Sequence, residues 1–139
     1  MTQEHPARLV SQRSMRCAEE KSKEEWLALF ADDAVVEDPV GPSLMDPEGK
    51  GHRGKAALSA FWDNNIGKSQ TKFNIERSYA VGTEVANVGH IDLTFVDGST
   101  AVCEGVFVYK IDDEGKLVSL RAFWELGKMM ATRKQSEKP

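Results

Sequence analysis

The chain has 139 residues, of which 40% are hydrophobic. This is enough for one compact domain with a buried core and too little for two. Its 18 Lys and Arg residues face 22 Asp and Glu residues, a formal charge of -4, so no basic excess favours a nucleic-acid partner or an anionic membrane surface. Neither a membrane-spanning apolar run nor a secretory signal pattern is present in the sequence. We therefore expect a cytoplasmic protein that binds neither nucleic acid nor membranes.

The motifs for metal and cofactor chemistry are missing from the sequence. Cys17 and Cys103 stand alone, without CxxC spacing or a nearby His cluster, which favours reduced, buried thiols over a disulfide or a metal site. A P-loop, a GxGxxG turn, a GxSxG elbow and an HExxH helix are all absent. We therefore expect no metal and no cofactor, which leaves acid/base chemistry or ligand binding.

The first third of the chain predicts two helices followed by a short strand. Small and apolar residues recur at three- and four-residue spacing over residues 6 to about 21, which is typical of an amphipathic helix. Ser22 and Glu25 form a capping-box pattern before a second, shorter helix that ends near residue 33. The strand that follows runs into Pro39, which restricts the preceding residue to an extended backbone. Asp38 is therefore expected at the end of a strand.

The rest of the chain predicts a loop, a third helix and a meander of strands. The segment from Gly41 to Gly54 is rich in Gly and Pro, which indicates a loop long enough to cover or border a site. A helical stripe over residues 55–66 follows. Alternation of apolar and polar residues, separated by turn signals, then predicts four antiparallel strands at 71–81, 84–96, 100–111 and 116–126. We expect an α+β domain over residues 1–126, with the sheet wrapped around three N-terminal helices, and a disordered tail over residues 127–139.

One segment of the sequence resembles a known family. LFADDAVVEDPVG, from Leu29 to Gly41, is similar to the steroid delta-isomerase (ketosteroid isomerase) family, which belongs to the nuclear-transport-factor-like or SnoaL-like cone folds. Gly54, the Phe61-Trp62 pair and GKLVSLRAFW over 115–124 extend the resemblance to roughly residues 8–126. It implies a curved, cone-shaped antiparallel sheet that encloses an apolar pocket. In that family, the aspartate of EDPxG is the general base, a role that maps to Asp38.

The resemblance also shows what the chain lacks. Ketosteroid isomerases hold the enolate oxygen with one tyrosine hydroxyl and one protonated aspartate. Counting from the matched segments places Ser14 at the tyrosine and Phe107 at the aspartate. Because loss of one such donor typically costs about two to three orders of magnitude in rate, the sequence predicts weak isomerisation. Ligand-binding positions implied by the same alignment are Ser14, Phe61, Phe107, Leu120 and Trp124.

Three polar residues on the predicted strands have two possible orientations. In one register, Val88, His90, Asp92 and Thr94 face the pocket, and His90 beside Asp92 would add a proton donor or acceptor. A shift of one residue would turn the Ile91 set inward and leave His90 and Asp92 in solvent or in a subunit interface. Glu104 is either a catalytic acid or, with Phe107 facing inward, a charge paired across a dimer interface.

These observations lead to one functional expectation and two alternatives. We expect a ketosteroid-isomerase-like protein that binds a steroid or a similar hydrophobic carbonyl compound, with Asp38 as general base. One alternative is a dehydratase or hydrolase that uses Asp38 with His90 and Asp92. The other is a non-catalytic protein that binds a hydrophobic ligand. We also expect a homodimer, because strands whose two faces are both apolar need a partner to cover the outer face.

Overall fold

The computed structural model describes residues 4–136, and they begin with two helices. α1 (Pro6–Glu20) has proline in its first turn and ends at Lys21 in the left-handed conformation. α2 (Lys23–Ala28) is shorter than predicted, and the Ser22 side chain makes no capping hydrogen bond. The chain leaves the helix early because Phe30 already pairs with Leu117 in the sheet. The prediction that this helix continues to residue 33 is therefore wrong.

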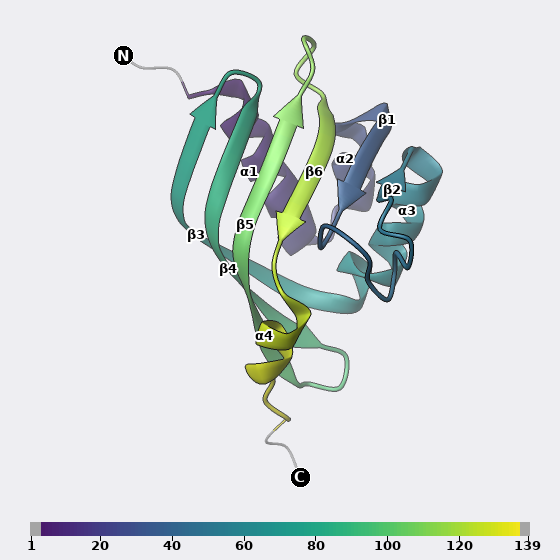
Figure 1. Cartoon of the computed structure of the whole chain (residues 1–139), viewed down its shortest axis with the longest axis vertical. Helices are drawn as coiled ribbons and strands as arrows, with labels where there is room; N and C mark the ends of the chain where they lie inside the picture. Colours follow the sequence, from purple (N-terminus) through teal and green to yellow (C-terminus); the bar gives the residue numbers. More distant parts are fainter. Residues whose placement is uncertain (1–3, 137–139) are drawn as a thin grey trace.

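One curved six-stranded sheet forms the body of the molecule (Figure 1). Its strands, in chain order, are β1 (Phe30–Glu37), β2 (His52–Arg53), β3 (Ser69–Val81), β4 (Glu84–Phe95), β5 (Thr100–Ile111) and β6 (Leu117–Phe123). Across the sheet they follow the order β2-β1-β6-β5-β4-β3. The four strands β3 to β6 form the antiparallel meander that the sequence predicts. β1 adds to β6 in parallel, so the sheet is mixed.

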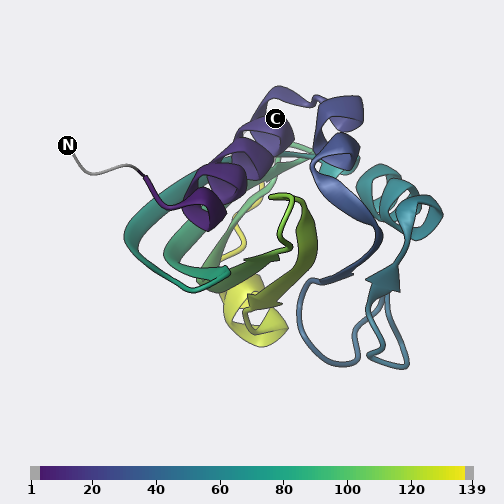
Figure 2. The same cartoon turned by 90° about the horizontal axis from the view of Figure 1, so that it is seen from above.

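The helices cover the concave face of this sheet. Seen from above, α1 lies across the hollow formed by the curved strands, while α2 and α3 (Lys55–Asn64) lie beside β1 (Figure 2). Between α3 and β3 the chain forms one short 3-10 turn, η1 (Ile66–Lys68). Aromatic side chains from α2, β1 and α3 pack together, with the Trp26 ring 4.7 Å from that of Phe30 and 5.3 Å from that of Trp62. This aromatic cluster closes one end of the cone.

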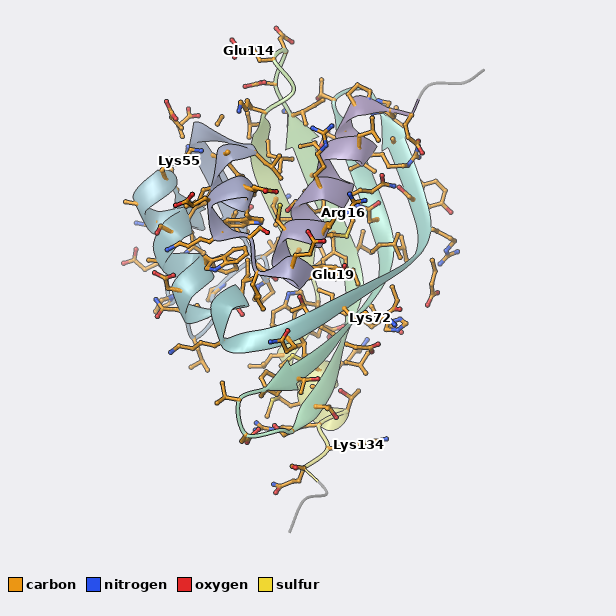
Figure 3. All side chains as sticks on the ribbon, turned by 180° about the vertical axis from the view of Figure 1, so that it is seen from behind. Arg16, Glu19, Lys55, Lys72, Glu114 and Lys134 are labelled. Atoms are coloured by element: carbon orange, nitrogen blue, oxygen red, sulfur yellow. The ribbon has the colours of Figure 1, made fainter. Side chains whose placement is uncertain are left out.

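The exposed side of α1 carries charged residues, some of which also reach the edge of the sheet. Arg16 and Glu19 are both exposed, and they point outward when the molecule is viewed from behind (Figure 3). The Glu19 carboxylate also accepts a hydrogen bond of 2.8 Å from the backbone N–H of Phe73 on β3. α1 is thus fixed to the sheet through its polar edge as well as its apolar face.

The C-terminal segment is ordered where the sequence predicts disorder. α4 (Leu126–Ala131) follows β6, and Lys134 then exchanges two backbone hydrogen bonds of 2.9 Å with Thr100 at the start of β5. The prediction of a disordered tail over 127–139 is therefore wrong for residues 127–136, and residues 137–139 lie outside the described part. A six-residue helix is too short to show an apolar period, so periodicity could not predict it. Within residues 4–136, no helix is both long and apolar enough to cross a membrane.

Candidate functional site

A cavity of about 260 Å³ lies between the helices and the concave face of the sheet. This volume is close to the lower end of small-molecule sites, roughly 300 Å³. Its wall is mostly apolar, and the inward rows of β3, β4, β5 and β6 form one side of it. The apolar side chains on these strands are Phe73, Ile91, Leu93, Phe95, Phe107, Tyr109, Leu120 and Ala122. Such a wall suits a hydrophobic ligand and leaves few positions for polar recognition.

Asp38 is the acidic residue of the cavity wall. It follows β1 directly and precedes Pro39, to which it is joined by a cis peptide bond. The Trp124 indole Nε1–H donates a hydrogen bond of 2.5 Å to its Oδ1. Burial raises the pKa of the Asp38 carboxyl above its ordinary value of 3.8, and the hydrogen bond from Trp124 and the nearby His52 only partly oppose this rise. The result is a carboxylate that is more basic than usual and is held by one donor.

Two further titratable side chains of the wall interact electrostatically with Asp38. Tyr109 is 3% exposed; burial and the Asp38 charge raise the pKa of its phenol, while a hydrogen bond with Ser14 opposes the rise. Burial and Asp38 together raise the pKa of the Cys103 thiol to about 12. Both groups therefore stay protonated at neutral pH, in the same part of the cavity as the carboxylate.

The five positions that the resemblance implies for ligand binding all lie on the cavity wall: Ser14, Phe61, Phe107, Leu120 and Trp124. Phe107 is 3% exposed and points inward, as the alternation along β5 predicts. Their contact with a ligand stays a prediction, whereas their position on the wall of the cavity that contains Asp38 is a property of the fold.

Of the two registers left open for β4, the structure shows the one that turns the Ile91 set inward, so the expectation that His90 and Asp92 act in the pocket is wrong. On β4 the cavity is lined by Ile91, Leu93 and Phe95. The side chains of His90 and Asp92 lie on the outer face, where His90 Nδ1 is 3.5 Å from Glu76 and Nε2 is 3.8 Å from Asp92. A one-residue shift exchanges the two faces of a strand, and burial of the apolar row is favoured over burial of two ionisable groups.

Glu104 also lies outside the cavity. It is exposed and pairs across the sheet with His90. Its position removes it as a catalytic acid of this cavity. Its pairing across a dimer interface stays a prediction.

The mouth of the cavity contains residues that the sequence analysis did not select. Ser43, Leu44 and Met45 come from the Gly- and Pro-rich loop, which borders the site as predicted, and Leu126 and Met129 come from α4. The α4 residues were missed because that segment was expected to be disordered. Cys103 and Phe95 were missed as site residues because only the register of β4 and β5 shows which row faces inward.

No group of three or more His, Cys, Asp or Glu side chains that could hold a metal ion occurs within residues 4–136. The chemistry available to the described wall is therefore that of one carboxylate, a few hydroxyl, thiol and amide groups, and apolar surface.

Comparisons with known proteins agree with this architecture. The SnoaL-like domain model matches residues 11–120. The chain is 34% identical to the steroid Delta-isomerase of Nocardioides simplex over 111 residues, which cover 76% of this chain and 78% of that protein. Among solved structures, the Delta 5-3-ketosteroid isomerase from Mycobacterium sp. is 41% identical with a TM-score of 0.83, over 93% of this chain and 97% of that one.

A second solved structure was determined with a steroid derivative. RV0760c from Mycobacterium tuberculosis, in complex with estradiol-17beta-hemisuccinate, is 35% identical with a TM-score of 0.85, over 90% of this chain and 98% of that one. The family model, the relative and both structures each match more than two thirds of the chain. The chain therefore belongs to the SnoaL-like domain family and is a steroid delta-isomerase-like member of it.

Proposed function

We propose that this protein binds a steroid or a similar polycyclic carbonyl compound and isomerises Δ5-3-ketosteroids with Asp38 as general base. The observation that carries the proposal is the Asp38 carboxyl, which lies in an apolar cavity, is held by the Trp124 indole and has a raised pKa. A base for carbon acids benefits from this combination, because loss of water makes the carboxylate more basic. The similarity to a steroid Delta-isomerase supports the substrate class.

The reaction moves one proton and shifts two electron pairs. The Asp38 carboxylate takes a proton from C4, and the electrons of that C–H bond form a C3–C4 double bond while the carbonyl electrons move onto O3. The protonated Asp38 then returns the proton to C6. The electrons flow back to re-form the C3 carbonyl, and the ring double bond moves from C5–C6 to C4–C5. Proton and electrons balance without a co-reactant.

We expect this activity to be weak. Phe107 offers no hydrogen-bond donor, and the Ser14 hydroxyl extends less far into the cavity than a tyrosine at the same helix position would. Each missing hydrogen-bond donor to O3 typically lowers kcat by about two to three orders of magnitude. Binding depends mainly on apolar area and should survive this loss.

The test is the appearance of conjugated-enone absorbance when the protein is mixed with a Δ5-3-ketosteroid. Wild type should convert the substrate at a rate proportional to enzyme concentration, and Asp38→Asn should abolish conversion while it retains steroid binding. The asparagine keeps the shape but cannot accept a proton from carbon. Asp92→Asn is the matched control, because it makes the same chemical change on the outer face. Equal rates for wild type and Asp38→Asn would remove Asp38 from the mechanism.

The two alternative functions differ in the support they receive. A dehydratase or hydrolase was expected to use His90 and Asp92, and both lie outside the cavity. A non-catalytic binding protein is favoured by Phe107 at the position of a donor. Steroid binding without any turnover in the enone assay would establish that second candidate and exclude the isomerase.

We further propose that the protein forms a homodimer through the outer face of its sheet and works in the cytoplasm. Val88, Val106 and Phe123 form one cross-strand row on that face, and Phe123 is 42% exposed. The free thiols of Cys17 and Cys103 fit a reducing compartment. Light scattering at micromolar concentration should give twice the chain mass, and Val106→Lys should reduce it to one chain. A monomeric wild type would contradict the dimer.

A further inference from the structure

The chain has two tyrosines, and they occupy opposite environments. Tyr79 on β3 is 57% exposed, whereas Tyr109 on β5 is 3% exposed and lines the cavity. Tyr109 is therefore the one phenol in the wall that encloses Asp38. A buried phenol beside a base is a candidate for a hydrogen-bonding role in the chemistry, because its hydroxyl is both a donor and an acceptor.

The strand register brings Tyr109 and Asp38 to the same part of the sheet. Val36 on β1 pairs with Leu120 on β6, and Leu120 pairs with Tyr109 on β5. These three residues form one inward row across neighbouring strands, so Tyr109 lies about 10 Å, or two strand spacings, from Val36. Asp38 is the next inward position after Val36. The Asp38 carboxylate and the Tyr109 phenol both line the cavity, and the Asp38 charge acts on the phenol.

Ser14 approaches the same phenol from the opposite wall. It lies on α1, is 3% exposed and forms a hydrogen bond with Tyr109. The hydrogen bond joins the hydroxyl groups of two residues that both line the cavity. A phenol hydroxyl can accept a hydrogen bond from the serine through its oxygen and still donate its own proton to a ligand. Ser14 and Tyr109 both line the cavity, so a ligand in it would lie next to their hydroxyl groups.

The other polar groups around Asp38 are less suited to hold a ligand oxygen. The Trp124 indole N–H is already donated to Asp38. The Cys103 thiol is a weak donor, and Phe107 has none. Ser14 alone is short and interacts with Tyr109. His52 also acts on Asp38 but does not line the cavity, so among the cavity-lining groups that interact with Asp38 the Tyr109 hydroxyl is the strong donor that remains.

We propose that the Tyr109 hydroxyl, oriented by Ser14, donates a hydrogen bond to the carbonyl oxygen of the bound ligand, an assignment that rests on the proposed binding of carbonyl compounds. As Asp38 takes the proton from C4, negative charge grows on O3, and a donor placed there stabilises it without giving up its own proton. The hydroxyl donor is thus supplied by β5, whereas the tyrosine of the ketosteroid isomerases corresponds to position 14 on α1. Tyr109 is the catalytic residue in this arrangement, and Ser14 is a positioning residue.

The test uses Tyr109→Phe, with Tyr79→Phe as the matched control because it removes the same hydroxyl from an exposed site. Tyr109→Phe should lower kcat for a Δ5-3-ketosteroid by about 100-fold with KM little changed, whereas Tyr79→Phe should leave both unchanged. Ser14→Ala keeps the phenol and should lower kcat by a smaller factor. A loss in Ser14→Ala greater than that in Tyr109→Phe would make the serine the donor and overturn the proposal.

A second readout does not depend on turnover. Progesterone has a conjugated 3-ketone that accepts hydrogen bonds, and its ultraviolet band moves to longer wavelength when a donor contacts that oxygen. Bound to wild type or to Tyr79→Phe, it should show this red shift, and bound to Tyr109→Phe it should lose it. A band that stays the same in Tyr109→Phe, or a wild type that does not bind progesterone, would overturn the proposal. If the shift depends on Tyr109 but wild type shows no isomerisation, the donor assignment stands and the proposed reaction fails.

Discussion

The hydrogen bond from Trp124 to Asp38 should set the pH range in which the protein is active. It is 2.5 Å long and joins an indole N–H to a carboxylate, and it holds the pKa of Asp38 below the value that burial alone would give. Trp124→Phe removes the donor and leaves an aromatic ring. Hydrogen bonds to charged groups contribute about 1.5–3 kcal/mol. A free energy of 1.36 kcal/mol corresponds to a factor of about ten in the ionisation equilibrium. The acid dissociation constant of Asp38 should therefore be about 10- to 100-fold smaller in the variant than in wild type.

The sign of the effect follows from the role of Asp38 as a base. Activity requires the carboxylate, so kcat/KM falls on the acid side of the profile as Asp38 is protonated. In Trp124→Phe this acid limb should move to higher pH, and kcat/KM on that limb should fall by about 10- to 100-fold. At alkaline pH the base is ionised in both proteins and the rates should approach each other. Trp62→Phe makes the same substitution at an indole outside the cavity wall and should leave the limb in place. A limb that stays fixed or moves to lower pH in Trp124→Phe would refute the reasoning.

Three further predictions concern stability and the outer face. Because burial raises the folded-state pKa of Asp38 above 3.8, the free energy of folding becomes less favourable as pH rises from 3.8 to that folded-state pKa. Asp38→Asn should therefore raise Tm at neutral pH, by a margin that shrinks as pH falls toward 3.8. A Tm difference between Asp38→Asn and wild type that grows at low pH would contradict a raised pKa of Asp38. A Cβ at Gly105 would lie 2.1 Å from the Phe123 carbonyl oxygen and 3.1 Å from Trp124 Cβ, so in urea titrations Gly105→Ala should cost about 1–3 kcal/mol. Gly127→Ala, where the added Cβ meets nothing within 4 Å, is its control, and equal stabilities would show that β6 adjusts freely. His90→Ala should leave kcat/KM for a Δ5-3-ketosteroid within about twofold of wild type, because solvent screens the charges on the outer face from the cavity. A larger loss would show that residues on the outer face influence catalysis.

Local patterns were sufficient to predict most of the fold. The meander from β3 to β6 follows from alternation and turn residues, and the segment around Asp38 identified the family whose architecture the structure shows. The position of Asp38 at the end of a strand follows from Pro39 alone. These features depend on neighbouring residues in the chain, which is why the sequence was informative about them.

The errors concern features that depend on contacts between distant segments. His90 and Ile91 are adjacent in sequence, and only the pairing of β4 with β3 and β5 decides which of them faces the cavity. α4 owes its position to contacts of the chain end with the beginning of β5. The proximity of Tyr109 to Asp38 arises across three strands and has no sequence motif. Alternation reveals that a strand has two faces, and tertiary contacts decide which face is buried.

The most direct test of the central claim follows one proton. A Δ5-3-ketosteroid labelled with deuterium at C4 is incubated with the protein, and the product is analysed by NMR for the position of the label. Proton transfer by Asp38 predicts a 4-en-3-one product that carries part of the deuterium at C6 with wild type, and no conversion with Asp38→Asn. Substrate that remains a 5-en-3-one with wild type, or label that reaches C6 equally fast with Asp38→Asn, would contradict the account.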